Sequence, residues 1–121
     1  MRALAPMTID GHDAGLEVLE ALRFHHRLLG AWAWRGRIPP GRALRIAPCA
    51  AVHTLGLRRP VEVAFCGADG RILRLVAPLP PGRIACCRGA LSAWEFRAGS
   101  SLRLGLAVGQ RLALQRAGVQ R

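Results

Sequence analysis

Hydrophobic residues alternate with polar or small ones along much of the chain after residue 42, and this period of two predicts β-strands. The clearest case is residues 92–97, where Trp94 and Phe96 share one face and Glu95 takes the other. The same alternation marks four further segments, 43–47, 61–66, 72–76 and 111–115. We therefore expect at least five short strands in the second two-thirds of the chain.

Turn signals separate these segments at intervals of roughly ten residues. Asp69-Gly70 is a strong hairpin signal, and the proline-rich stretches 38–41 and 79–82 predict tight turns. Residues 101–110 predict a single helical turn followed by a glycine-rich bend. Short strands joined in this way are typical of a β-sandwich or a small barrel.

The first third of the chain is less regular. Residues 1–13 are expected to be a loose tail, ahead of a single domain at 14–117. Residues 16–22 fit a helical stripe better than a strand, and 23–34 are expected to form a short helix that Gly30 interrupts. The predicted fold class is mainly β: a single-domain β-sandwich or barrel-like fold with one or two short helices.

The net charge of +11 over 121 residues raises the question of nucleic-acid binding. All 18 basic residues are arginine, and lysine, asparagine and tyrosine are absent, as an extremely GC-rich coding sequence would produce. The arginines are also scattered singly, without a block of like charge. A solvated arginine surface is therefore the expected interpretation, and nucleic-acid binding is a minor alternative.

No apolar run approaches the roughly 20 residues that a membrane-spanning helix needs, and the N-terminal stretch lacks the apolar core of a signal peptide. We therefore expect a cytoplasmic protein without a membrane span. In that setting the four cysteines would be reduced thiols rather than a disulfide framework.

An ordered series of short motifs runs from residue 48 to residue 114. It begins with Pro-Cys at 48–49 and Val-His-Thr at 52–54, and it includes a Cys-Arg-Gly-Ala segment at 87–90. In order and spacing, the series resembles a bacterial and archaeal family known as domain of unknown function 192. The matching positions are Pro48, Cys49, Val52, His53, Thr54, Gly56, Arg58, Pro60, Asp69, Gly70, Pro80, Arg83, Cys87, Arg88, Gly89, Ala90, Glu95, Gly99, Gly105 and Gly109.

The chain departs from that family's pattern at three positions. Glu62 stands where the family has Asp, Gly82 where a Trp is common, and Gln110 where an Asp closes the glycine bend. A site that relied on a short carboxylate at position 62 would be altered by the extra methylene. The resemblance implies a mainly β, sandwich-like domain with a polar cluster, and it implies no reaction because no activity is established for the family.

Polar side chains interrupt the apolar strands within this family-like stretch. A buried carboxylate needs a partner, and Glu62 and Glu95 could pair with Arg58, Arg83 or Arg88. His53 and Thr54 follow the apolar Val52, where a further strand could begin. We expect one polar corner that binds a small ligand or a protein partner, formed by His53, Thr54, Glu62, Arg83 and Glu95. The alternative is purely structural, with a hydrogen-bonded His53 and carboxylate–arginine pairs at the rim of the sheet.

An enzyme is the rival interpretation, in which a small hydrolase uses His53 as a base that a carboxylate orients. A metal site is less well supported, although Cys49 and His53 have a ligand-like separation. No Cys-x-x-Cys pair exists, and the neighbours Cys86 and Cys87 would point to opposite faces of a strand. We therefore expect a non-catalytic accessory domain without a metal or cofactor. Its ligand, partner and oligomeric state stay open.

Overall fold

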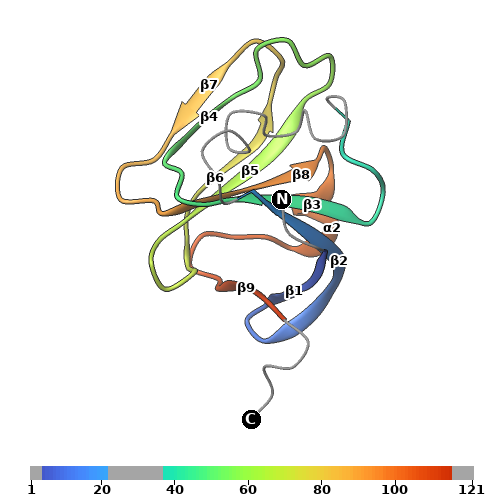
Figure 1. Ribbon diagram of the computed structural model, residues 1–121, viewed down its shortest axis with the longest axis vertical. Coiled ribbons are helices and arrows are strands. Elements are labelled where there is room, and N and C mark those ends of the chain that lie inside the picture. The colour runs from blue at the N-terminus through green and yellow to red at the C-terminus, as the bar shows by residue number, and fades with distance from the viewer. Residues whose placement is uncertain (1–3, 22–36, 116–121) are drawn as a thin grey trace.

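The computed structural model describes residues 4–21 and 37–115, which form a β-rich unit with one short helix (Figure 1). The strands are β1 (Ala5–Ile9), β2 (His12–Ala21), β3 (Arg42–Ile46), β4 (Ala51–His53), β5 (Val61–Cys66), β6 (Ile72–Leu79), β7 (Ile84–Cys86), β8 (Ser92–Arg97) and β9 (Leu112–Leu114). The helix is α2 (Ser100–Leu104). The mainly β fold class is thereby confirmed. No helix in the described part of the chain is long and apolar enough to span a bilayer.

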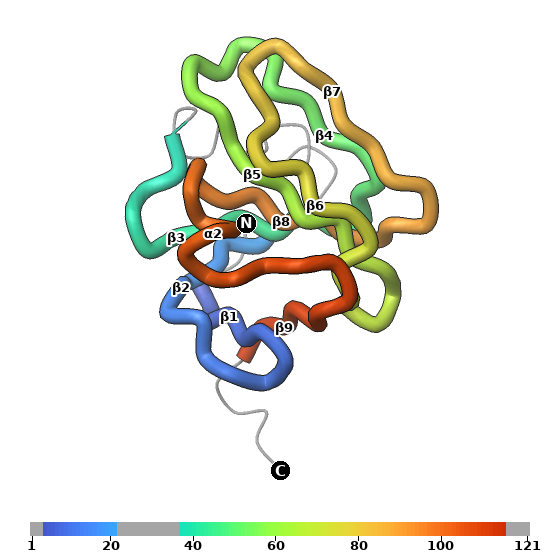
Figure 2. The backbone as a smooth tube through the Cα atoms, turned by 180° about the vertical axis from the view of Figure 1, so that it is seen from behind, coloured from blue at the N-terminus to red at the C-terminus, as the bar shows by residue number. Residues whose placement is uncertain are grey.

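Seven strands form one sheet in the order β6-β5-β8-β3-β2-β1-β9, antiparallel except where β2 and β3 run parallel. The first and last strands of this order meet near residue 70. The Ile72 amide donates to the Gln110 carbonyl (2.8 Å), and the Leu112 amide donates to the Gly70 carbonyl (2.9 Å). Figure 2 shows the chain after α2 crossing the molecule to reach this junction. These bonds close the sheet into a barrel-like wall.

The closed sheet has an apolar cluster on each face. The inner core, enclosed by the barrel, contains Met7, Val18, Ala43, Ala64, Ile72, Trp94, Phe96 and Leu112 among its buried residues. The outer core contains Leu44, Ile46, Val61, Val63, Phe65 and Ala93, and residues of β4, β7 and the nearby loops cover it. β4 and β7 form a separate two-stranded ribbon at the end of the molecule away from β9 (Figure 1).

The strands predicted from the alternation are confirmed as β3, β5, β6, β8 and β9, and the expected helical turn is α2. Trp94 and Phe96 face the inner core, whereas Glu95 takes the opposite face, as predicted. Strand β5, between β6 and β8, is buried at all six positions because both of its faces are covered. For that reason Glu62 is buried as well.

Two expectations for the first third of the chain are wrong. Residues 5–9 form β1 rather than a loose tail, because Met7 is fully buried in the inner core and β1 pairs with both β2 and β9. The segment expected to be helical at 16–22 is extended as far as residue 21 and belongs to β2, whose pairing with β3 outweighs the helical spacing of its leucines. The short helix predicted at 23–34 lies outside the described residues.

Candidate functional site

His53 and Thr54 lie where β4 ends. Thr54 is buried, and its hydroxyl donates to the Pro80 carbonyl (2.5 Å) and accepts from the Arg83 amide (2.9 Å). His53 is exposed, and its Nδ1 accepts a hydrogen bond from the Leu55 amide at 3.2 Å. Thr54 therefore anchors the turn that precedes β7. His53 stabilises its own loop.

Glu62 holds the start of α2 from a neighbouring strand. Its two carboxylate oxygens accept hydrogen bonds from the amides of Gly99 (2.7 Å) and Ser101 (2.6 Å). These amides belong to the first turn of the helix, where backbone donors have no partner within the helix. Gly99 at the N-cap provides no side-chain cap of its own. The carboxylate of Glu62 therefore takes the place of an N-cap side chain.

Glu95 points to the other side of the sheet. On adjacent strands it stands opposite Leu44 and Val63, two fully buried aliphatic residues. Burial raises the pKa of its carboxyl group to about 7. Within residues 4–21 and 37–115, no hydrogen bond or ion pair to this carboxyl group is found.

The five predicted residues do not meet at one corner. Thr54 and Arg83 are joined through their backbones, with His53 beside them, whereas Glu62 and Glu95 extend from opposite faces of the sheet. In the described part of the chain, no hydrogen bond or ion pair links His53 to either carboxylate. The hydrogen bond between His53 and a carboxylate that the proposed hydrolase would need is thus not formed among the described residues. A ligand-binding role for any of the five stays a prediction.

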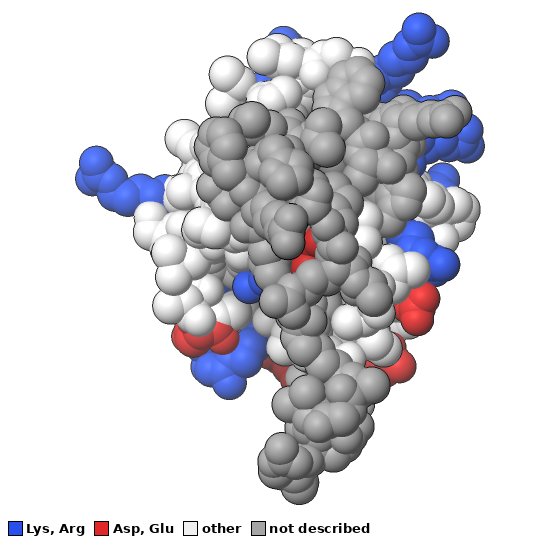
Figure 3. Space-filling view, in the orientation of Figure 1, with Lys and Arg blue, Asp and Glu red and all other residues white. Residues whose placement is uncertain are grey.

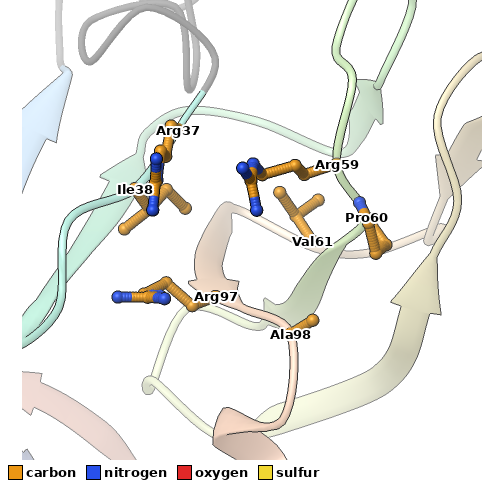
Figure 4. A pocket seen from close by; sticks show the side chains of 7 residues that line it. All are labelled: Arg37, Ile38, Arg59, Pro60, Val61, Arg97 and Ala98. Atoms are coloured by element: carbon orange, nitrogen blue, oxygen red, sulfur yellow. The ribbon is translucent and has the colours of Figure 1, made fainter.

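A different set of side chains surrounds a pocket of about 140 Å³. Arg37 and Ile38 precede β3, Arg59 precedes β5, and Arg97 ends β8. Figure 4 shows the Arg59 side chain extending toward that of Arg37, which runs downward, and the Arg97 guanidinium group lying below Arg37. Pro60, Val61 and Ala98 complete the lining.

β-sheet pairing fixes one wall of this pocket. Arg97 lies directly opposite Val61 in the β5–β8 ladder, so Arg97 is on the outer-core face of β8, like Glu95. Ile38 and Val61 are almost fully buried, at 3% and 4% exposure, and they form an apolar floor. Arg59 reaches over this floor from the segment before β5 (Figure 4). Three distant parts of the sequence thus bring their positive charges to one hollow.

The pocket contains positive charge without an acidic partner. Among residues 4–21 and 37–115, no aspartate or glutamate lines the pocket, and none of Arg37, Arg59 and Arg97 forms an ion pair. Arg37 and Arg59 are exposed and Arg97 is half-buried, so solvent weakens the repulsion between their like charges without removing it. An anion bound between the three guanidinium groups would relieve that repulsion.

A second, mostly polar cleft of about 280 Å³ lies between β9 and the hairpin at 67–70. There the Arg45 guanidinium donates to the buried carboxylate of Glu20 at 2.8 Å and lies over the ring of Trp94, 5.6 Å from its centroid. The indole N–H of Trp94 donates to the Ser92 hydroxyl (3.3 Å). The charge of Arg45 is therefore already balanced within the protein.

The thiol nearest to this second cleft is unreactive. Cys66 is fully buried, and burial raises the pKa of its thiol to about 12. A thiol is a nucleophile only as the thiolate, so Cys66 is not a nucleophile near neutral pH. No group of three His, Cys, Asp or Glu side chains placed to hold a metal occurs in residues 4–21 and 37–115.

Sequence reasoning did not find the arginine pocket. Arg97 looks like a single surface charge, Arg59 is one of the adjacent pair Arg58-Arg59, and Arg37 stands before a turn. One signal was available, because the alternation along 92–97 places Arg97 on the same face as the buried Ala93. The approach of the segments at 37–38 and 59–60 depends on tertiary packing.

Comparison with known proteins supports the fold and does not identify a function. No family model matches the chain, and no curated protein does. A protein of unknown function from Novosphingobium aromaticivorans is similar in structure, with a TM-score of 0.79 and 19% identity over 91% of this chain and 84% of that one. A proposed transcription regulator from Sinorhizobium meliloti is similar at a TM-score of 0.79 and 22% identity, over 93% of this chain and 94% of that one. At these identities the likeness shows a shared fold alone.

Proposed function

We propose that this domain is a non-catalytic binding module that holds a small anion between Arg37, Arg59 and Arg97. The observation that supports the proposal is that three arginines line one pocket with an apolar floor, without acidic partners among the described residues. Guanidinium groups donate in a planar fork that matches the oxygens of carboxylates and phosphates. A small anion would therefore gain several charge-assisted hydrogen bonds in this pocket.

The lining favours binding over catalysis. Arginine does not titrate near neutral pH, and Ile38, Pro60, Val61 and Ala98 offer no side-chain group that could accept or donate a proton. General acid–base chemistry requires such a group within hydrogen-bond reach of the substrate. The ligand would therefore be held without being changed.

The test is a calorimetric titration with sulfate at low ionic strength, where electrostatic binding is least screened. Arg59→Gln and Arg97→Gln should each weaken sulfate binding about tenfold or more, since a hydrogen bond to a charged group contributes about 1.5–3 kcal/mol. Arg58→Gln is the matched control, because it removes the same charge at the neighbouring residue, which does not line the pocket. Equal losses in the control and the pocket variants would mean that sulfate responds only to net charge.

A nucleic-acid function is the second candidate, and the net charge of +11 favours it. One of the structures with a similar fold is a proposed transcription regulator. Against this candidate, Figure 3 shows basic side chains at several separate places on the face in view, some of them beside acidic ones. Nucleic-acid binding predicts an affinity that falls steeply with salt. A gel-shift experiment without retardation at low salt would exclude it.

We further propose that the chain belongs to the domain of unknown function 192 family and works in the reducing cytoplasm. The ordered motifs from residue 48 to residue 114 support the first point. The thiols of Cys66, Cys86 and Cys87 support the second. An alignment of that family that could not keep Pro48, His53 and Gly89 in one register would contradict membership.

A further inference from the structure

The number of donors in the arginine pocket indicates which kind of anion fits it. Each guanidinium group carries five N–H donors in a fixed plane, and three of these groups line the pocket. A carboxylate has two oxygens and a single negative charge, so it can engage fewer of the three groups. A phosphate monoester has three terminal oxygens and a charge of about −1.5 to −2 at neutral pH. The monoester therefore matches three arginines better in both charge and oxygen count.

The pocket also has an apolar side. Figure 4 shows Pro60 and Ala98 on the side away from the guanidinium groups of Arg37 and Arg97. Both residues are exposed, so a ligand can reach them, and Ile38 and Val61 lie beneath as the buried floor. A bare inorganic ion would fill the charged side and leave this apolar side in water. A ligand with a hydrocarbon group beside its charge would cover both sides.

The size of the pocket limits the ligand further. Its volume of about 140 Å³ is below the roughly 300 Å³ at which pockets for drug-sized molecules begin. That space suits one charged head with a short hydrocarbon attachment. A nucleotide or a lipid tail would extend far beyond it.

We infer that the pocket recognises a small organic phosphate monoester, with the phosphate held by Arg37, Arg59 and Arg97 and the ester substituent packed against Pro60 and Ala98. This inference rests on the proposed function, because it names the class of anion for the same site. The chemistry that it requires is a dianionic phosphate next to an apolar group. A phosphorylated side chain of a protein could present the same phosphate, so the experiment includes it as a separate arm.

The experiment compares four ligands by calorimetry at pH 8: phenyl phosphate, inorganic phosphate, benzoate, and a short peptide with one phosphoserine. Phenyl phosphate should bind about tenfold or more tightly than inorganic phosphate, since it alone adds apolar burial to the dianion, and it should exceed benzoate by a similar factor. Ala98→Ser should reduce the preference for phenyl phosphate over inorganic phosphate. Arg97→Gln should reduce the preference for phenyl phosphate over benzoate. Arg58→Gln should change neither preference.

Failure of this inference can be told apart from failure of the proposed function. If none of the four ligands binds, the pocket is not an anion site and both proposals fall. If the anions bind with equal affinity, or if benzoate binds most tightly, anion binding stands and the phosphate monoester is wrong. Tighter binding of the phosphoserine peptide than of phenyl phosphate would replace the small molecule with a phosphorylated protein and overturn that part of the inference.

Discussion

The buried carboxyl group of Glu95 makes a sharp prediction about pH and stability. Leu44 and Val63 face it from the two neighbouring strands, and burial raises its pKa from an ordinary 4.5 to about 7. Between these two values the folded protein holds a proton that the unfolded chain has released. Stability therefore falls as the pH rises from about 4.5 to about 7, because the unfolded state binds fewer protons there.

The size of the effect follows from the two pKa values. They differ by about 2.5, from 4.5 to about 7, and each unit of pKa corresponds to about 1.4 kcal/mol. Ionisation of Glu95 should thus cost the folded state about 3 kcal/mol above neutral pH, as an order of magnitude. Glu95→Gln keeps the shape of the protonated acid and cannot ionise. Its free energy of unfolding should match that of the wild type at acid pH and exceed it by about 3 kcal/mol at pH 8.

Urea unfolding followed by circular dichroism, at steps from pH 4.5 to pH 8.5, measures this difference directly. Glu17→Gln is the matched control, because Glu17 is a half-exposed glutamate whose ion pair with Arg42 spans 3.5 Å. Such surface pairs contribute about 0–1 kcal/mol, so the control should lose little stability and should not gain any as the pH rises. A constant difference between wild type and Glu95→Gln across the whole range would refute a buried, titrating carboxyl group.

The remaining predictions concern single contacts and can all be measured by urea unfolding. Glu62→Gln should lower the free energy of unfolding by about 2–4 kcal/mol, because an amide cannot accept from both backbone donors at the start of α2; no loss would mean that the cap is unimportant. Thr54→Val should cost about 1–3 kcal/mol by leaving the Pro80 carbonyl and the Arg83 amide unpaired, whereas Thr54→Ser should recover most of it. Gly70→Ala should lower the free energy of unfolding by about 1–3 kcal/mol or more. Gly70 has a φ of 85°, and an added Cβ would lie 2.6 Å from the backbone oxygen of Leu112. Unchanged stability would contradict this close approach, which closes the barrel.

The alternation of residues was enough to predict most of the sheet. Along β8 the large Trp94 and Phe96 face the inner core, whereas Ala93 and Glu95 lie on the other face, so the period of two is visible in the sequence. The N-terminal hairpin was missed although its signal is the same as the one used later in the chain. Asp10-Gly11 joins β1 to β2, with both residues at positive φ, as a two-residue hairpin turn requires. The nearby leucines at helical spacing obscured that signal.

Predicting the site was harder because strand pairing decides which faces meet. Glu62 and Glu95 are both glutamates within apolar strands, and their sequence surroundings do not tell them apart. Their separation to opposite faces depends on the register of β5 against β8, in which Val63 rather than Glu62 stands opposite Glu95. A shift of one residue would have placed the two carboxylates side by side. Register is a property of the assembled sheet.

The contrast between two arginine environments supports the proposed anion site. Arg45 has a buried carboxylate and an indole ring as partners, so its charge is satisfied by the fold itself, and burying such a pair seldom adds stability beyond holding a side chain in place. Arg97 is as firmly placed by its strand, yet the described residues around it provide only other cations and apolar groups. Water solvates these charges in the empty protein, because Arg37 and Arg59 are exposed and Arg97 is half-buried. The proposed anion would pair with three positive charges that the described residues leave without an acidic partner.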